Sequence, residues 1–366
     1  MSEPIRILQV FASLDRGGAE AMIMNLYRKI DKEKIQFDFV VNDRDTEYAH
    51  EKEITDLGGR IFRVPRFKLF NYSTYKKAWI NLFENHPEWE IVHGHHTSPA
   101  FIYLSVAKRK KRLTIAHSHT AGTDKNIKSY SKKLMRLPLR YISDYLFACS
   151  DKASKWMFGN RSKKAHLINN SIDSAVFSYD ECIRNKARKN LGIEDRFVIG
   201  HIGRFQTQKN HNFLIDVFYE VRKKNSHAVL LLIGDGDLRS SIKKKVESQG
   251  LEGSVLFLGV RSDIPELLLA MDMFLFPSLY EGLPVTLMEA QASGLKILAS
   301  DTITNEVAIT DNVEFMSLNK SAKAWADRIM KYSNGYERKD TSQEIVSAGY
   351  DIKSTAKWYE NFMLKL

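Results

Sequence analysis

Short apolar runs alternate with helix-like segments along the whole chain, and this alternation restricts the fold more than any other feature of the sequence. It is typical of parallel sheets whose strands are joined by crossover helices. The strands predicted for the first half are Ile5–Phe11, Phe37–Val41, Arg60–Val64, Ile91–His93, Thr114–Ala116 and Tyr145–Ala148. Those predicted for the second half are Val198–Ile202, Val229–Ile233, Val255–Leu258, Met273–Phe276 and Ile297–Ala299. The sequence therefore predicts an α/β protein with two doubly wound parallel sheets in succession.

The chain is too long for one ordinary hydrophobic core. Its 366 residues predict two domains of about 150–200 residues each. Between the two sets of strands, the segment from Ser171 to Arg196 is polar and rich in charge. We therefore place the connection near Asn170–Asp173, which gives an N-terminal domain of residues 1–172 and a C-terminal domain of residues 173–350.

Composition is that of an ordinary globular protein, with 43% hydrophobic and 27% charged residues. Cys149 and Cys182 are too few for a disulfide framework, so both are expected to be reduced thiols of a cytoplasmic protein. The first apolar run, Ile5 to Ala12, is too short for a signal peptide. No run approaches the roughly 20 apolar residues that span a bilayer. The sequence therefore predicts a protein that is not integral to a membrane.

The net charge of +11 is unevenly distributed. Five consecutive cations at 108–112 are followed by Lys125, Lys128, Lys132, Lys133, Arg136 and Arg140. Between Ser129 and Tyr145 the cations are interspersed with leucine and isoleucine, which predicts an amphipathic helix on an anionic membrane surface. A solvated helix face would have the same pattern. Nucleic acid is the least favoured partner, because aromatic residues do not alternate with the cations.

Ligands of doubly wound sheets bind at the carboxyl ends of the strands, so the residues that follow each strand are candidates for a site. The first strand is followed by Gly17 and Gly18, which open a helix from about Ala19 to Ile30. Paired glycines allow a ligand to approach the backbone beside a helix amino terminus. A plain tight turn would have the same sequence.

Two later strands end in histidine clusters, formed by His93, His95 and His96 and by His117 and His119. Three roles are open: a metal site, strand-end side chains satisfied within the protein, or polar contacts with a substrate between the domains. Neither cluster has Cys, Asp or Glu at ligand spacing, so a metal site is the least favoured role. Contact with a substrate is the most favoured.

In the C-terminal domain, the first strand ends in Gly203-Arg204, and Lys209 follows at a helix start. Two cations that flank a glycine turn can neutralise a diphosphate, although an Arg and a Lys on an ordinary surface would look the same. The next strand ends in Gly234-Asp235-Gly236, which matches neither the dinucleotide fingerprint nor the P-loop.

The third strand of this domain ends in a turn where Val260 and Arg261 could read the edge of a base. Immediately after it, Asp263 and Glu266 have the spacing of a helix capping box, which would be a purely structural feature.

The segment Pro277 to Ser300 places Glu281 in a loop and Glu289 eight residues later on a helix. Between them, Gly282, Leu283 and Pro284 are predicted to start the helix, because proline suits a first helical turn. The free amides there would attract a phosphate or a sugar hydroxyl. Glu289 could accept hydrogen bonds from a ribose diol, so the segment offers partners for three parts of a nucleotide sugar.

Taken together, these residues resemble a retaining glycosyltransferase of the GT-B fold, in family 4, the family of bacterial capsular and exopolysaccharide enzymes. The resemblance covers essentially the whole chain and is strongest in the Glu281-to-Glu289 element, Gly203-Arg204, Lys209-Asn210 and Gly234-Asp235-Gly236. It implies two Rossmann-like domains that face each other across a cleft. It also implies that a last helix, residues 351–366, crosses back to the first domain with Trp358 and Phe362 on its apolar side.

The resemblance implies that Arg204 and Lys209 hold the donor diphosphate, that Glu281 contacts the donor sugar and that Glu289 binds the ribose hydroxyls. It places His117 beside the reacting sugar, with His119 as a less favoured candidate. The implied catalytic residues are His117, Glu281, Arg204 and Lys209. The implied donor-binding residues are Gly17, Gly18, Gly203, Arg204, Lys209, Gly234, Val260, Arg261, Glu281, Gly282, Leu283, Pro284 and Glu289.

The implied reaction moves a sugar from a nucleotide sugar, most often a UDP-sugar, to a glycan acceptor carried on lipid. The closest form of a metal-binding Asp-x-Asp element, Asn42-Asp43-Arg44-Asp45, is interpreted as a loop, so cations are expected in place of a metal, and no cofactor is expected. Glu281 and Glu289 then act as binding groups, which disfavours a hydrolase with a carboxylate pair. Two alternatives stay open, a sugar-nucleotide epimerase of the same fold and a non-catalytic partner subunit. The expected location is cytoplasmic, including the inner face of the cell membrane.

Overall fold

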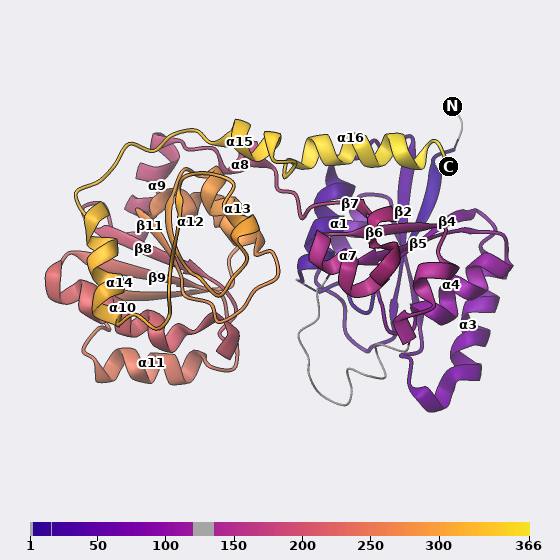
Figure 1. The fold of residues 1–366 in the computed structure, drawn as a ribbon, viewed down its shortest axis with the longest axis horizontal. Helices are drawn as coiled ribbons and strands as arrows, with labels where there is room; N and C mark the ends of the chain where they lie inside the picture. Colours follow the sequence, from indigo (N-terminus) through magenta and orange to yellow (C-terminus); the bar gives the residue numbers. More distant parts are fainter. Residues whose placement is uncertain (1–2, 16, 120–134) are drawn as a thin grey trace. The chain divides into compact units, whose positions relative to one another are not determined.

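The computed structural model describes residues 3–15, 17–119 and 135–366 (Figure 1). The chain forms two compact units. Unit 1 comprises Met1–Ser171 together with Ile352–Leu366, and unit 2 comprises Ile172–Asp351. Unit 1 is therefore assembled from both ends of the chain, and the last helix returns to it as the resemblance implied. In the part of the chain that the structure describes, no helix is both long and apolar enough to cross a bilayer.

Unit 1 contains a seven-stranded parallel sheet with the strand order β3-β2-β1-β4-β5-β6-β7. Its strands are β1 (Ile5–Val10), β2 (Ile35–Asn42), β3 (Arg60–Val64), β4 (Trp89–Gly94), β5 (Leu113–Ser118), β6 (Tyr145–Ala148) and β7 (His166–Leu167). Its described helices include α1 (Gly18–Lys29), α2 (Glu51–Asp56), α3 (Tyr72–Asn85), α4 (Ala100–Arg109), α6 (Leu139–Ile142), α7 (Asp151–Phe158) and α16 (Ile352–Met363). The strand order reverses between β1 and β4, which is where doubly wound sheets bind ligands.

Unit 2 contains a six-stranded parallel sheet with the strand order β10-β9-β8-β11-β12-β13. Its strands are β8 (Phe197–Ile202), β9 (Ala228–Ile233), β10 (Val255–Gly259), β11 (Met273–Phe276), β12 (Lys296–Ser300) and β13 (Val313–Met316). Its helices are α8 (Ser174–Phe177), α9 (Glu181–Leu191), α10 (His211–Lys224), α11 (Arg239–Ser248), α12 (Ile264–Ala270), α13 (Val285–Ala292), α14 (Ala322–Ile329) and α15 (Ser342–Ser347). Here the order reverses between β8 and β11.

All eleven predicted strands are present, and two short strands, β7 and β13, were missed. β7 has only two residues, and all four residues of β13 are half-buried. An apolar run marks only strands that are covered on both faces, so edge strands of this kind leave a weak signal. Central β9, by contrast, is buried at all six positions.

Each sheet has a hydrophobic core on both faces. In β1, Ile7 packs into the core that includes α1 and α16, whereas the adjacent Leu8 packs into the core on the other face. This alternation follows from the two-residue period of a strand. The apolar side chains along each strand therefore fix the sheet between two helical layers and leave the strand ends for polar groups.

Helix α16 packs against α1, with Ile352, Ala356, Tyr359 and Met363 buried. Trp358, predicted to lie on the apolar side with Phe362, is 39% exposed, and its ring lies 5.9 Å from that of the buried Phe147. The buried residues recur at intervals of three and four, as one face of a helix requires. Trp358 falls beside that face and stacks on the partly buried Phe362 with ring centroids 5.2 Å apart.

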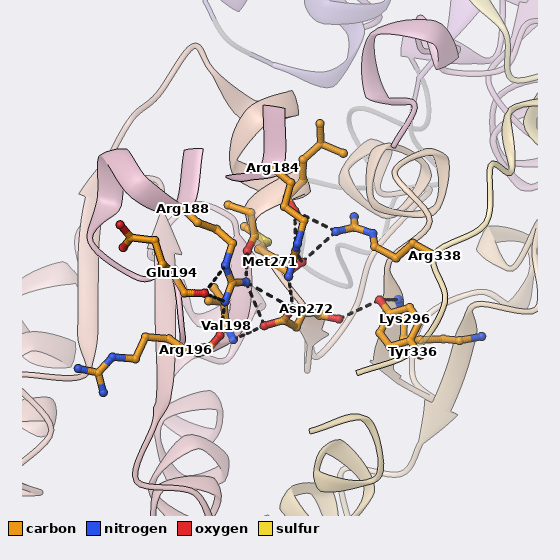
Figure 2. Close-up of polar contacts among 12 residues, drawn as sticks. Arg184, Arg188, Glu194, Arg196, Val198, Met271, Asp272, Lys296, Tyr336 and Arg338 are labelled. Carbon is orange, nitrogen blue, oxygen red and sulfur yellow. Dashed lines mark hydrogen bonds and ion pairs between the residues drawn. The ribbon is translucent and has the colours of Figure 1, made fainter. Parts of the chain in front are cut away.

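A polar cluster at Asp272 holds the amino-terminal ends of β8 and β11 (Figure 2). The Asp272 carboxylate accepts hydrogen bonds from Arg184, at 2.5 Å, and from the backbone N–H of Val198, at 2.7 Å. Arg338 donates to the last carbonyls of α12 and to that of Met271. Cations suit the carboxyl end of a helix, so this cluster stabilises the edge of the sheet opposite the strand ends that bind ligands.

The predicted amphipathic helix from Ser129 to Tyr145 is only partly within the described residues, since Lys125, Lys128, Lys132 and Lys133 lie outside them. Where the chain is described, one helix through Tyr145 is wrong: a turn at 137–138 precedes α6, and β6 begins at Tyr145. Pro138 explains the break, because proline disfavours helical backbone at the residue before it. The guanidinium of Arg136 lies 3.8 Å from the centre of the Trp156 ring, so this cation contacts the protein.

Candidate functional site

Two glycine turns meet at the carboxyl ends of β8 and β9 in unit 2. The N–H of Gly203 donates to the carbonyl of Ile233 at 2.9 Å, and the N–H of Gly234 donates to that of Gly259 at 2.8 Å. Gly234 has φ +132°, and a Cβ there would lie 2.2 Å from the Gly203 carbonyl oxygen. Only glycine fits such an approach, which explains why a glycine follows β9.

Lys209 and Glu281 form an ion pair at this edge of the sheet. Lys209 ends a short 3-10 turn, Thr207–Lys209, and its Nζ lies 2.7 Å from Glu281 Oε1. Gln208 Nε2 donates to the other carboxylate oxygen at 2.9 Å. The lysine and glutamate side chains are only 16% and 8% exposed, and the Lys209 ammonium also lies 4.7 Å from the Phe276 ring centre. The predicted diphosphate-binding and sugar-binding side chains are therefore in direct contact.

Arg204 lies in the turn after β8, and its side chain is exposed. Among the described residues no carboxylate lies within ion-pair distance of its guanidinium. The guanidinium of this exposed arginine, which has five N–H donors, is therefore accessible to an anion.

Glu281 lies in a loop and Glu289 within α13, as the sequence predicted. Pro284 is the residue that precedes the helix rather than part of its first turn, so α13 starts one position later than expected. A Cβ on Gly282 would meet nothing within 4 Å, so the backbone beside Glu281 faces open space. Burial raises the pKa of the partly exposed Glu289 from 4.5 to about 7.

Val260 and Arg261 follow β10 and are both exposed, Val260 by 59%. Arg261 is bound to Asp263 through two hydrogen bonds, of 2.8 and 2.6 Å. The predicted capping box of Asp263 and Glu266 is wrong, because the Asp263 side chain makes no cap to α12. Its carboxylate binds the nearer guanidinium instead, and a charge-assisted pair of bonds is stronger than one cap.

In unit 1, Gly17 caps α1 and Gly18 is its first residue, directly after β1. A Cβ on Gly18 would meet nothing within 4 Å. A Cβ on Gly17 would lie 2.3 Å from Glu20 Oε2, so the amino terminus of α1 has open space beside Gly18 and the Glu20 carboxylate beside Gly17. This is where the sequence placed a ligand contact from the first domain.

The strand-end histidines of β4 and β5 form a hydrogen-bonded network with Gln9 and Tyr359. His93 joins Tyr359 through Nδ1 at 3.0 Å and His117 through Nε2 at 3.1 Å. His95 joins His119 through Nδ1 at 2.7 Å and Gln9 Oε1 through Nε2 at 2.8 Å. Burial, followed by the neighbouring histidines, lowers the pKa of His93 and His117 well below 6.5, so both rings are neutral at pH 7.

The Gln9 amide connects the strand-end histidines to α16. Its Nε2 donates to the Tyr359 hydroxyl at 3.3 Å, and its Oε1 lies 2.8 Å from His95 Nε2. The Tyr359 hydroxyl in turn shares a hydrogen bond of 3.0 Å with His93 Nδ1. His117 Nε2 is buried and has no hydrogen-bond partner among the described residues. This nitrogen is therefore left for a further hydrogen bond.

Nitrogen atoms of His93, His95 and His117 lie within 4.8 Å of one another, a separation that a metal ion could bridge. All four nitrogens of His93 and His95, however, are used by the hydrogen bonds of the network. A metal would have to displace several of these bonds. The geometry favours the interpretation of this group as a hydrogen-bonded network.

Two family models match the chain. The model described as Glycosyltransferase Family 4 matches residues 16–176, and the model described as Glycosyl transferases group 1 matches residues 183–350. EpsF of Bacillus subtilis, a glycosyltransferase by name, is 35% identical over 360 residues, which are 95% of this chain and 93% of EpsF. The chain is also similar to the UDP-Gal:alpha-D-GlcNAc-diphosphoundecaprenol alpha-1,3-galactosyltransferase of Escherichia coli, with 25% identity over 275 residues and 70% of each chain covered.

Among solved structures, Anabaena HepE in complex with UDP and glucose has the same fold, with a TM-score of 0.81 and 17% identity over 99% of this chain and 100% of HepE. The two parallel sheets and these matches define a glycosyltransferase of the GT-B fold. The chain belongs to glycosyltransferase family 4. The matches do not favour an epimerase or a non-catalytic subunit.

Three residues of these sites were missed from the sequence. Gln9 had a signal, because it is a polar residue inside an apolar strand and is fully buried. Tyr359 could have been found by following the buried face of α16 at intervals of three and four residues. Gln208 had no signal of its own, because its partner Glu281 is 73 positions away.

Proposed function

We propose that the protein transfers a sugar, with retention, from a UDP-sugar to a glycan acceptor carried on lipid, in the synthesis of a cell-surface polysaccharide. The observation that carries the proposal is the buried Lys209–Glu281 pair beside the glycine turns at the carboxyl edge of the unit 2 sheet. The printed names of the relatives support it, since the Escherichia coli enzyme is named for UDP-Gal and a diphosphoundecaprenol acceptor. HepE, which shares the fold, was crystallised with UDP and glucose.

In this proposal unit 2 binds the donor. Breaking the bond between sugar and phosphate leaves negative charge on the departing diphosphate, and preorganised cations stabilise that charge. Arg204 is exposed and suited to bind two phosphate oxygens, while Lys209 supplies a point charge beside them. The amino terminus of α13, reached past Gly282, adds backbone amides. These groups act in place of a metal ion.

Glu281 has two tasks in this proposal. Its carboxylate fixes the Lys209 ammonium, which has three protons and therefore keeps donors for a phosphate after pairing. The open backbone at Gly282 leaves room for the donor sugar next to the same carboxylate. Glu289 accepts hydrogen bonds from the ribose diol, and Val260 and Arg261 contact the base. Neither glutamate acts as the acid or base of a hydrolase.

Unit 1 binds the acceptor in this proposal and supplies contacts from Gly17, Gly18 and His117. In this proposal His117 Nε2, which has no partner among the described residues, donates a hydrogen bond to a hydroxyl of the reacting sugar, and the network with His93, Gln9 and Tyr359 holds the ring in place. A donor held in this way needs no reorganisation when charge develops. The acceptor hydroxyl then attacks from the face that the diphosphate leaves, which retains the configuration.

Two arginines at opposite ends of β8 test the donor site. Arg204 follows the carboxyl end of the strand, and Arg196 precedes its amino end, where its exposed side chain points away from the Asp272 cluster (Figure 2). Calorimetry with a panel of nucleotide sugars should show binding of a UDP-sugar to the unaltered protein. Arg204→Ala should weaken that binding about tenfold or more, the loss expected for a charge-assisted hydrogen bond.

Arg196→Ala is the matched control and should bind the same donor with unchanged affinity. A protein that binds no nucleotide sugar, or two variants with equal affinity, would contradict the proposed donor site. Transfer of labelled sugar to a lipid-linked acceptor measures the second half of the proposal.

A further inference from the structure

The loop between β3 and α3 carries the two most exposed large apolar side chains of the described residues. Leu69 is 70% exposed and Phe70 is 86% exposed, and Tyr72 next to them is 43% exposed. Most large apolar side chains of this protein are buried in one of the two cores of their unit. Adjacent leucine and phenylalanine side chains directed to solvent therefore need a partner.

This apolar tip, residues 66–72, is held in a defined shape. Asn71 Oδ1 accepts a hydrogen bond from the N–H of Lys68 at 2.7 Å, and Asn71 Nδ2 donates to the carbonyl of Arg66 at 3.0 Å. Phe67 points inward and lies 5.2 Å from the Tyr75 ring. The turn thus anchors one aromatic ring and exposes the next two apolar side chains.

The charged side chains of the apolar tip and of the first turns of α3 are all cations. Residues 65–78 contain no Asp or Glu, and their cations are Arg66, Lys68, Lys76 and Lys77. Three of these cations are exposed and the fourth is half-buried. Apolar side chains with cations nearby in the sequence fit an anionic bilayer, where the apolar groups enter the acyl region and the cations contact the headgroups.

The apolar tip also borders a cavity of unit 1. A cavity of about 460 Å³ lies at the carboxyl ends of β1, β2 and β4, and both Arg66 and Phe67 line it. Its other lining residues follow those strands and include Ser13, Asn42 and His96. A molecule held in a bilayer at the apolar tip would reach this cavity without leaving the membrane surface.

We propose that the apolar tip docks unit 1 on an anionic lipid bilayer, with Leu69 and Phe70 inserted and the four cations against the headgroups. The residues of the apolar tip are not those of the basic segment that the sequence analysis singled out. The assignment of a bilayer rests on the side chains of the tip. The function we assign to this docking is the delivery of a lipid-linked acceptor to the adjacent cavity, and that function rests on the proposed function.

Sedimentation of the full chain with vesicles tests the docking surface. The unaltered protein should bind phosphatidylcholine vesicles that contain about one third phosphatidylglycerol far more strongly than vesicles of phosphatidylcholine alone. Raising the NaCl concentration to about 0.5 M should weaken this binding, because salt screens the cations. The double variant Leu69→Ser/Phe70→Ser should lower the partition coefficient about tenfold or more. Both side chains are exposed, so its thermal unfolding midpoint should match that of the unaltered protein.

Val176→Ser/Ile183→Ser in unit 2 is the matched control, since these apolar side chains are 53% and 42% exposed. This control should bind vesicles like the unaltered protein. Equal vesicle binding by both double variants would overturn the proposal and move docking to another surface. Absence of vesicle binding by the unaltered protein would also overturn it, and capture of a protein at the tip would then identify the alternative partner.

Donor affinity separates this proposal from the proposed function. Leu69→Ser/Phe70→Ser should keep the UDP-sugar affinity of the unaltered protein and lose transfer only to an acceptor embedded in vesicles. If the unaltered protein binds vesicles through the tip but no nucleotide sugar, the proposed function fails and the docking surface stands.

Discussion

Glu289 combines partial burial with a carboxyl group whose pKa is raised to about 7. A ribose diol donates two hydrogen bonds, which the ionised carboxylate accepts better than the protonated acid. The free protein holds the protonated form below pH 7, so a donor that requires the carboxylate must expel that proton. Donor affinity should therefore depend on pH near the pKa of Glu289.

The affinity for UDP-glucose, or for the UDP-sugar that binds best, should fall as pH is lowered below 7 and approach a tenfold loss per pH unit. Calorimetry from pH 5.5 to 8.5 measures it. Nucleotide sugars are the suitable probe, because the terminal phosphate of a free nucleotide titrates near pH 6. Glu289→Gln should bind more weakly and show a flat profile; the same slope in this variant would assign the proton to another group.

At the scale of elements, a buried aspartate fastens the amino-terminal ends of four strands in unit 1. Asp38 on β2 accepts hydrogen bonds from Arg6 on β1, from Arg60 on β3 and from the indole of Trp89 on β4. Burial alone would raise the Asp38 pKa, but the bonds from Arg6, Arg60 and Trp89 outweigh it and lower the pKa to about 2. Asp38 therefore contributes stability above pH 3.8, which is lost as pH falls toward 2.

Asp38→Ala should lower the free energy of unfolding of unit 1 by about 3 kcal/mol, because it leaves a buried indole N–H and two arginines without their acceptor. Urea denaturation at pH 7 measures the change. Asp56→Ala is the matched control, since Asp56 pairs with Lys52 on the surface of α2 at 2.7 Å and should cost less than about 0.5 kcal/mol. Equal losses in the two variants would contradict a structural role for the Asp38 cluster.

At the scale of the whole molecule, the two units differ in continuity. Unit 2 is one segment, Ile172–Asp351, whereas unit 1 needs α16 from the end of the chain. The buried face of α16 brings Ile352, Tyr359 and Met363 into the core of unit 1. Burial of three large side chains contributes about 5–9 kcal/mol, which is comparable with the total stability of a domain.

A fragment of residues 172–351 should fold cooperatively and bind a UDP-sugar within about tenfold of the full chain, given that most proposed donor contacts lie in unit 2. A fragment of residues 1–171 should fail to fold, because α16 is missing. Joining residues 352–366 to that fragment through a flexible linker should restore a cooperative transition. Circular dichroism during heating distinguishes these outcomes, and a stable 1–171 fragment would contradict the role of α16.

Much of the architecture was readable from the sequence. Strands β9 and β11, buried on both faces, are apolar throughout, and these two strands were predicted to within one residue. The rule that ligands meet the carboxyl ends of strands then selected Gly203, Lys209 and Glu281 as site residues. The half-buried β13 was missed, because partial burial leaves a mixed pattern of apolar and polar residues.

The sequence by itself determined the fold class, the two domains and the family, because buried strands and glycine turns have recognisable local patterns of residues. Only the tertiary structure decided which polar groups meet. Lys209 pairs with Glu281 across 72 positions, and Tyr359 reaches His93 across 266. Hydrogen bonds between distant segments depend on distance in space and have no period along the chain, so only the folded structure joins Tyr359 to His93 and, through His93, to His117.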